Sequence, residues 1–537
     1  MPLASRCLLV MAAPFAACSP NLVYLLADDL GINEVGFMNA TRGLSTPRLD
    51  ALAASGIILD NYYVLPICSP TRSALMTGRY PVRLGTHANV IFWDTPWAVS
   101  REHTFFPEAL QRRGYLTAKF GKWHLGMFRD EFLPTRRGFN RSAGYLQGCE
   151  AAFTHVAACC EAATPAADEG YVCPHAANDT SKDYRGYDWW ADDAPDLAAN
   201  GTKSSQLIVE TAGEFLEMLA ATPAAARPPY FLYLPFQNVH APYTTLPRFR
   251  AAFDNDTALT DDEKTMFGYI SELDAAVGAV VDAQASLGLA DDTLVVFSSD
   301  NGAPSAAGVR GRNWPLRGFK SQLWEGGVKV AGFVAGSLVP PPARGSRFAG
   351  LMHVVDWFPT LLGRAAGGGA PAARSYALDG VDQWDALVGG APSARDRLLY
   401  NINPLCEGGQ AAAPKAGVRV GDYKLLAYCY AVAGVAGANA TGPRPPADGA
   451  WPASWPGSAR NSSVVLFDLA ADPRETTDLS AEQPSKVDEL LDALRDFAAV
   501  TVEPMQWVPP FQGDDYECAA CPLRNATGPY EPWAPWM

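Results

Sequence analysis

The sequence lacks any hydrophobic run long enough to cross a membrane. A transmembrane helix needs about 18 or more consecutive apolar residues, and no segment of the chain reaches that length. The first residues hold one positive charge at Arg6, an apolar run and then small residues, which is typical of a secretory signal peptide. A buried first strand is the alternative. We therefore predict a signal peptide at residues 1–18 and a mature chain without a membrane span.

Positive charge is in the minority. The chain has 42 Lys and Arg residues against 57 Asp and Glu residues, which gives a formal net charge of -15. This balance argues against nucleic acid or an anionic membrane as a partner bound through bulk charge. A few cations in a small pocket could still bind an anionic substrate, because charges beyond a Debye length of about 8 Å are screened.

Charged residues are few, at 18% of the chain, while hydrophobic residues make up 48%. This composition is typical of a globular protein and excludes a disordered one. The length of 537 residues is too great for one simple core. We expect one large domain plus a smaller one, or two to three domains of ordinary size.

Cysteine is sparse, with 11 residues in the chain. Two lie in the predicted leader, and Cys68 stands apart in the segment PICSPTRSALMTGRYP. An even number remains, which predicts four disulfides in an oxidising compartment with a connectivity that the sequence does not reveal. The remaining eight are Cys149, Cys159, Cys160, Cys173, Cys406, Cys429, Cys518 and Cys521. A redox or zinc motif at CAAC, residues 518–521, is the alternative for the last two.

Asn-x-Ser/Thr sequons are more frequent than chance would give. They indicate a glycosylated chain that passes through the secretory pathway, either to the lysosome or to the extracellular space. The sequons begin at Asn39, Asn140, Asn178, Asn200, Asn255, Asn439, Asn461 and Asn525.

Apolar strands alternate with amphipathic helices up to about residue 394. This order predicts an α/β domain with a mainly parallel sheet, whose sites form beyond the carboxyl ends of its strands. The strands are expected at 21–31, 229–243 and 292–303, and the helices at 46–56, 205–222 and 262–288. From residue 395 the pattern changes to antiparallel strands and one helix. We therefore predict a catalytic domain at 19–394 and a smaller subdomain at 395–537.

Acidic and amide side chains follow two of the expected strands. Asp28 and Asp29 come after the first strand, and Asp300 and Asn301 come after the strand at 292–299. Side-chain oxygens of this kind suit a hard cation, Ca²⁺ or Mg²⁺, better than zinc. Each pair alone would more often be a turn or a helix cap.

Candidate cations and histidines are spread along the chain. Arg72 follows Cys68 by four residues, Lys122 lies beside His124, and Lys320 precedes the turn LWEGG. Both His124 and His240 are placed in loops that follow apolar strands, which favours a functional role. Taken singly, each lysine or arginine would be a solvated surface charge and each histidine a structural residue.

Five motifs in order resemble the sulfatase family. CSPTR at 68–72 with LMTGR at 75–79 matches its signature, although Met76 stands where leucine is frequent. GKWHLG, SDNG, LRGFKSQLWEGGVK at 316–329 and LFDLAADPRETTDLS at 466–480 match further elements. The wording at 316–329 is most similar to the arylsulfatase B-like branch, the N-acetylgalactosamine-4-sulfatases.

The resemblance implies a fold, a cofactor and a reaction. The fold would be an alkaline-phosphatase-like sandwich of a large mixed sheet between helices, with a smaller C-terminal antiparallel sheet and one helix. A formylglycine-generating enzyme would oxidise Cys68 to formylglycine during maturation. One Ca²⁺ would be held by Asp28, Asp29, Asp300, Asn301 and residue 68. The enzyme would cleave a sulfated saccharide or a small sulfate ester through a sulfated intermediate on residue 68.

The resemblance also implies roles around residue 68. Arg72 would steady the hydrated aldehyde, and Lys122 would bridge residue 68 and a sulfate oxygen. His124 would take the proton that triggers release of sulfate. His240 and Lys320 would face the leaving oxygen, and one of them would donate a proton.

Three alternatives remain open. The chain could be a phosphonate or phosphodiester hydrolase of the same superfamily, which can share the formylglycine motif. It could be a catalytically silent binding protein that keeps Cys68 as a thiol. It could also be an enzyme whose Cys68 thiol is activated by His124 or His240, which leaves the aspartates unexplained.

Overall fold

The structure is a computed structural model with side chains. It describes residues 19–39, 44–92, 97–158, 185–304, 312–365, 377–403, 414–428, 464–502 and 504–505. The predicted signal peptide and the CAAC motif lie outside these residues, as do all the cysteines except Cys68 and Cys149.

A mixed sheet of ten strands forms the centre of the described part of the chain, in the order β12-β2-β11-β10-β1-β9-β3-β4-β7-β8. Its middle strands, β10, β1, β9, β3 and β4, are parallel, while β11, β7 and β8 join antiparallel. The bounds are β1 Asn21–Ala27, β2 Ile57–Tyr63, β3 Leu116–Phe120, β4 Arg141–Gly144, β7 Trp190–Ala191, β8 Ala194–Pro195, β9 Tyr230–Pro235, β10 Thr293–Ser299, β11 Gly332–Ala335 and β12 Ser346–His353. The predicted mainly parallel mixed sheet is confirmed.

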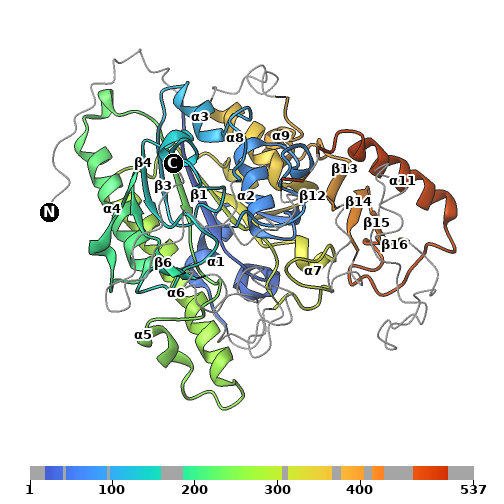
Figure 1. The fold of residues 1–537 in the computed structure, drawn as a ribbon, viewed down its shortest axis with the longest axis horizontal. Coiled ribbons are helices and arrows are strands. Elements are labelled where there is room, and N and C mark those ends of the chain that lie inside the picture. Colours follow the sequence, from blue (N-terminus) through green and yellow to red (C-terminus); the bar gives the residue numbers. More distant parts are fainter. Residues whose placement is uncertain are drawn as a thin grey trace, which may run out of the picture.

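Helices cover both faces of this sheet (Figure 1). Side chains of β1 alternate between two cores, with Leu22 and Leu26 in one and Val23 and Leu25 in the other. This alternation explains why the strand is apolar at every position, as expected of a strand buried on both faces. The first core includes helices α2 Cys68–Thr77, α3 Phe106–Gln111 and α8 Trp357–Ala365, and the second includes α1 Pro47–Ala54, α4 Ser204–Ala221 and α6 Asp261–Ser286.

The helix ends follow local sequence signals. Thr260 caps α6, and its hydroxyl accepts a hydrogen bond from the backbone N–H of Glu263 at 3.2 Å. The Glu263 carboxylate accepts the Thr260 N–H in return, which completes a capping box. Helix α2 ends at Gly78, whose φ of 64° suits glycine. Shorter elements are α5 Pro247–Arg250, α7 Glu325–Val328, α9 Trp384–Gly389, β5 Val156–Ala158 and β6 Arg185–Tyr187.

The C-terminal part forms a second, antiparallel sheet of four strands in the order β13-β14-β15-β16. The amphipathic helix α11 packs on it and buries Leu490 and Leu494 (Figure 1). The bounds are β13 Arg397–Ile402, β14 Ala416–Val420, β15 Tyr423–Ala427, β16 Val464–Asp468 and α11 Pro484–Ala498. The smaller sheet with one helix is thus confirmed, while the domain boundary at 394/395 stays a prediction.

A buried charge cluster joins the two sheets. Lys424 on β15 has no exposed surface and lies 3.0 Å from the Glu325 carboxylate and 2.8 Å from that of Glu475. The Tyr63 hydroxyl at the end of β2 donates to Glu325 at 2.7 Å and accepts from Arg419 on β14. Burial tends to raise the pKa of the Glu325 carboxyl, but the charge of Lys424 outweighs this effect and lowers the pKa to about 2.

Three other expectations concern the surface and the cysteines. Within the described residues, the helices include none with the length and apolar character that a membrane span requires. All four sequon asparagines in this part of the chain are exposed, namely Asn39, Asn140, Asn200 and Asn255. Cys149 is half-buried and forms no disulfide within the described residues, and because the other seven cysteines lie outside them, the four disulfides stay a prediction.

Candidate active site

Two neighbouring parallel strands bring the acidic residues together. Strands β1 and β10 pair in a register that sets Ala27 opposite Ser299, so residues 28–29 and 300–301 leave the same edge of the sheet side by side. The backbone N–H of Asp29 donates to a carboxylate oxygen of Asp300 at 3.2 Å, and the Asn301 amide donates to Asp29 at 2.7 Å. The structure therefore gathers the four predicted metal ligands of these two strands into one cluster.

Cys68 is the first residue of α2 and points into this cluster. The thiol is buried, and its Sγ lies 3.6 Å from Oδ1 of Asp28. The Thr71 hydroxyl accepts the Leu65 N–H at 3.0 Å and so closes the loop that leads into the helix. Backbone N–H groups of a first helical turn favour a negative group at this position.

Arg72 and Lys122 are fully buried against the carboxylates. The Arg72 guanidinium donates twice to one oxygen of Asp300, at 2.8 and 3.1 Å, and lies 3.5 Å from Asp28. The Lys122 ammonium donates to Asp28 at 2.6 Å. The Nη1 group of Arg72 is buried and has no hydrogen-bond partner in the described residues, so it can serve an oxygen that enters the site.

His240 and Lys320 form a second cationic group on Asp29. The Lys320 ammonium donates to Asp29 at 2.9 Å and to Nε2 of His240 at 3.2 Å. The Nδ1 atom of His240 lies 2.6 Å from the carbonyl oxygen of Ala241 and must therefore carry a proton. His240 is thus a neutral imidazole that accepts a hydrogen bond from Lys320, and the mobile proton resides on the lysine.

His124 is a buried histidine whose imidazole is neutral. Its backbone has a φ of 57°, and Nδ1 has no hydrogen-bond partner in the described residues. Burial and the charge of Lys122 lower the pKa of His124 well below its ordinary value. Gly148 packs against the ring, because a Cβ at that position would lie 2.8 Å from Cε1 of His124. The imidazole is therefore held in place with a free lone pair.

Carboxylates dominate the electrostatics of the cluster. Burial and the charge of Asp300 raise the pKa of Asp28 to about 7, against the opposing effect of Lys122. Burial tends to raise the pKa of the Asp29 carboxyl, but interactions with Lys320 and His240 outweigh this effect and lower the pKa to about 2. Burial and the charge of Asp300 raise the pKa of the Cys68 thiol well above its ordinary value. A thiolate is therefore strongly disfavoured at Cys68.

The donor set fits a hard divalent cation. Ligand atoms of Asp28, Asp29, Cys68 and His240 all lie within 4.8 Å of one another. The Oδ1 atom of Asn301 is buried without a hydrogen-bond partner in the described residues, although its amide nitrogen is bonded. A cation coordinated by carboxylate and amide oxygens would satisfy this atom and relieve the repulsion between Asp28 and Asp300. His240, which the sequence did not suggest as a ligand, lies against the same cluster.

Sequence reasoning missed two supporting residues. Ser69 donates to the carbonyl oxygen of His124 at 2.9 Å and accepts the Ile91 N–H at 3.0 Å, which ties the motif helix to the histidine loop. Gly148 is the other, since it makes room for the imidazole. The second position of the CSPTR motif was a signal for Ser69, whereas a single glycine gave no signal for Gly148.

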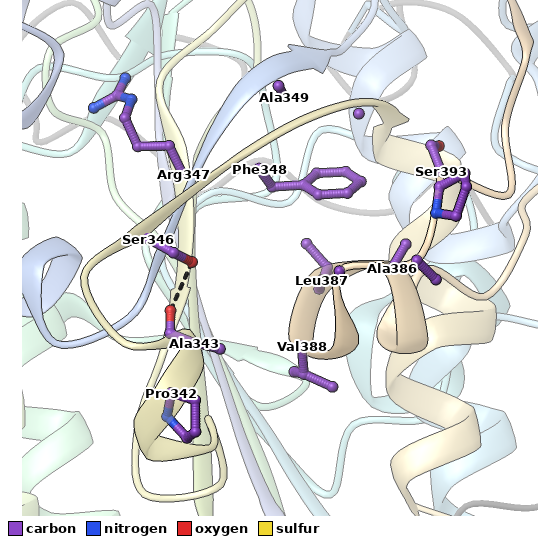
Figure 2. A pocket seen from close by; sticks show the side chains of 14 residues that line it. Pro342, Ala343, Ser346, Arg347, Phe348, Ala349, Ala386, Leu387, Val388 and Ser393 are labelled. Atoms are coloured by element: carbon purple, nitrogen blue, oxygen red, sulfur yellow. Dashed lines mark hydrogen bonds between the residues drawn. The ribbon is translucent and has the colours of Figure 1, made fainter.

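The groove shown in Figure 2 lies apart from this cluster. Its volume is about 420 Å³, and it is lined by residues of β12, of α9 and of the loops beside them. Phe348 and Leu387 face it, and its one cation, Arg347, is already paired with Asp60. None of the candidate catalytic residues lines it.

An α/β sheet with acids, buried cations and a nucleophile position at its strand ends defines a hydrolase of anionic esters. The chain belongs to the sulfatase family, because the Sulfatase family profile matches residues 20–368. It is similar to arylsulfatase J of Mus musculus, with 32% identity over 91% of this chain and 77% of that protein. It is equally similar to arylsulfatase A of Homo sapiens, with 32% identity over 93% of this chain and 92% of that protein.

The fold agrees with this assignment. The crystal structure of Ps i-CgsB in complex with k-i-k-neocarrahexaose matches 90% of this chain and 94% of that chain, with a TM-score of 0.70 and 24% identity. The alkaline-phosphatase-like sandwich is thereby confirmed, and the protein is a sulfuric ester hydrolase. The finer assignment to the arylsulfatase B-like branch stays a prediction.

Proposed function

We propose that this enzyme removes sulfate from a sulfated saccharide or an aryl sulfate, with formylglycine at residue 68 and one Ca²⁺. The observation that carries the proposal is the position of Cys68, whose buried side chain lies 3.6 Å from Asp28 among fixed cations. A buried thiol with a raised pKa is a poor nucleophile, whereas an aldehyde hydrate in the same place is a good one. Saccharide substrates are supported by the structural relative crystallised with neocarrahexaose.

The first step is attack on sulfur. One hydroxyl of the hydrated aldehyde at residue 68 gives its proton to the neighbouring Asp28 carboxylate and forms an S–O bond. The bond from sulfur to the alcohol oxygen breaks, and the leaving oxygen takes a proton from the Lys320 ammonium. Arg72 and Lys122 lie where they can donate to oxygens that gain negative charge. Ca²⁺, bound by Asp28, Asp29, Asp300 and Asn301, would polarise the sulfate.

The second step releases sulfate. His124 takes the proton of the remaining hydroxyl, the C=O bond reforms and the C–O bond to sulfate breaks. The unpartnered Nδ1 atom and the lowered pKa of His124 support this role, because the lowered pKa keeps the imidazole neutral before the proton is transferred. Water then hydrates the aldehyde again.

Two of the three alternatives leave a feature of the site unexplained. A thiol enzyme would need a Cys68 thiolate, which burial and Asp300 disfavour. A silent binding protein would have no use for an ordered set of acids, bases and cations around residue 68. A phosphonate or phosphodiester hydrolase uses the same groups, so assays with matched sulfate and phosphate esters must separate it from a sulfatase.

The direct test combines mass spectrometry and activity on chain from a secretory host that can make formylglycine. The peptide that contains CSPTR should carry an aldehyde in place of the thiol, and the protein should release sulfate from aryl and saccharide sulfates. An unmodified thiol in fully active protein would contradict the proposal. Maturation by a formylglycine-generating enzyme and a secreted or lysosomal location are part of the same proposal.

The leaving-group side gives a prediction that depends on the substrate. His240→Ala should slow hydrolysis of a saccharide sulfate by ~10²–10⁴-fold, because it removes the imidazole that positions the Lys320 ammonium, and a sugar alkoxide leaves poorly without a proton. It should slow an activated nitrophenyl sulfate much less, because nitrophenolate is stable as an anion. The measurement is kcat on both substrates.

His124→Ala is the matched control for this prediction. It should trap sulfated enzyme with either substrate, because His124 acts after the alcohol has left. Equal losses on both substrates for His240→Ala would instead assign His240 to sulfate binding.

A further inference from the structure

One aromatic side chain is exposed on the loop that delivers Lys320. Four large apolar side chains are exposed in the described residues, namely Leu197, Met218, Trp314 and Val502. Trp314 has the highest exposed fraction, 67%, and lies six residues before Lys320. An extended chain spans at most ~3.6 Å per residue, so the Cα atoms of these two residues lie within ~22 Å of each other.

The loop that carries Trp314 is anchored beside the metal ligands. Asn313 is buried, and its side chain forms hydrogen bonds with both the N–H and the C=O of Ala303, at 2.9 and 2.8 Å. Ala303 follows Asn301 by two residues and also accepts the Lys320 N–H at 3.1 Å. Trp314 therefore projects from a fixed turn whose two ends both contact the residue next to the candidate active site.

The other side of the turn is fixed to the C-terminal part of the chain. The guanidinium of Arg317 packs over the Trp324 ring at 3.4 Å and donates to the carbonyl oxygen of Glu475 at 2.8 Å. Arg474, the residue before Glu475, is exposed and lies over the Trp314 ring, 5.2 Å from its centroid. In the described part of the chain, no carboxylate forms an ion pair with Arg474.

We propose that Trp314 and Arg474 form an outer subsite for a second sugar of a sulfated oligosaccharide. The apolar face of a pyranose ring packs well on an exposed indole. A guanidinium without a carboxylate partner offers charged donors to a sulfate group on the same sugar. The inference rests on the proposed function and narrows its substrate to saccharides longer than one residue.

A role in stability alone does not account well for the Trp314–Arg474 pair. Exposed cation–π contacts contribute only about 0.5–1 kcal/mol to stability. The contact between Arg474 and Trp314 therefore stabilises the fold only slightly. The loop is also held firmly without Trp314, through Asn313 and Arg317. The part of the indole that Arg474 does not cover is therefore available to a ligand.

The test compares substrates on the purified full-length enzyme. The probes are sulfated tetrasaccharides from chondroitin, dermatan, heparan and carrageenan, with 4-nitrophenyl sulfate as a substrate too small to reach Trp314. Trp314→Ala should raise KM for the tetrasaccharide that is cleaved fastest by about tenfold, the effect of losing one aromatic contact. Values of kcat for this substrate, and both constants for 4-nitrophenyl sulfate, should stay within about twofold of wild type.

Matched variants separate the subsite from a structural effect. Leu197→Ala removes another exposed side chain, 60% exposed and located in the 3₁₀ helix Leu197–Ala199, and should change neither substrate's KM. Arg474→Ala should raise KM for the tetrasaccharide and reduce its salt dependence, while Arg474→Lys should restore part of both. An unchanged tetrasaccharide KM in Trp314→Ala overturns the proposal.

A binding measurement keeps the outcomes distinct. Calorimetry with the same tetrasaccharides on Cys68→Ala protein should show about tenfold weaker binding when Trp314 is also replaced. A wild-type enzyme that cleaves 4-nitrophenyl sulfate and binds none of the tetrasaccharides overturns the subsite and leaves the proposed function intact. A wild-type enzyme that cleaves no sulfate ester refutes the proposed function, and the calorimetry then decides the subsite alone.

Discussion

Cys68→Ser is expected to give an enzyme that turns over once and then stops. A serine hydroxyl can attack sulfur in the same position, but the resulting ester lacks the second hydroxyl that expels sulfate. The steady-state kcat should therefore fall by ~10⁴-fold or more, in the range seen when a covalent nucleophile is lost. Intact-protein mass spectrometry after incubation with substrate should show one added sulfate group per chain.

Cys149→Ser is the control for this prediction, because Cys149 is the other thiol in the described residues. It should keep near wild-type kcat and show no retained sulfate. Multiple turnovers by Cys68→Ser at the wild-type rate would refute the need for an aldehyde at this position.

Asp300→Ala is expected to abolish cation binding and to destabilise the fold. It removes one oxygen ligand and leaves the buried guanidinium of Arg72 without its main partner. Breaking a buried ion pair by removing one partner costs about 3–5 kcal/mol. In wild-type protein, added Ca²⁺ should raise the midpoint of urea unfolding, because a ligand that binds only the native state stabilises it. The variant should lack this response.

Asp356→Ala is a matched control, since it removes a carboxylate from another buried pair, that with Arg395. It should lower the free energy of unfolding to a similar extent but keep the response to Ca²⁺ and the activity of the folded fraction. If Asp300→Ala keeps a wild-type response to Ca²⁺, the assignment of Asp300 as a ligand is wrong.

The sequence predicted the central strands β1, β9 and β10 of the sheet and the clustering of the acidic residues. The apolar segments 21–31 and 292–303 became the adjacent parallel strands β1 and β10, so the acidic groups behind them met at one edge. Such strands are recognisable because both faces are buried and the apolar run is continuous. The short strand β11 was missed, because a four-residue strand carries too little pattern.

Other features could not be predicted, because they depend on contacts between distant segments. The tautomer of His240 follows from a carbonyl group and from Lys320, which is 80 residues away. Lys119 lies buried on β3 with no hydrogen-bond partner in the described residues, and burial lowers its pKa to about 7. The sequence around Lys119 did not indicate that its ammonium group would be buried. Only the folded structure shows which charged side chains are desolvated.

The buried cluster around Lys424 has a consequence for anyone who divides this chain for expression. A recombinant fragment that stops at residue 394 would retain every candidate catalytic residue, yet it would lose Lys424 and leave Glu325 without its cation. Glu325 lies five residues after Lys320, so a distortion around Glu325 would reach Lys320 in the candidate active site. A loss of activity in a missense variant of the C-terminal sheet is therefore no sign that this sheet contacts the substrate.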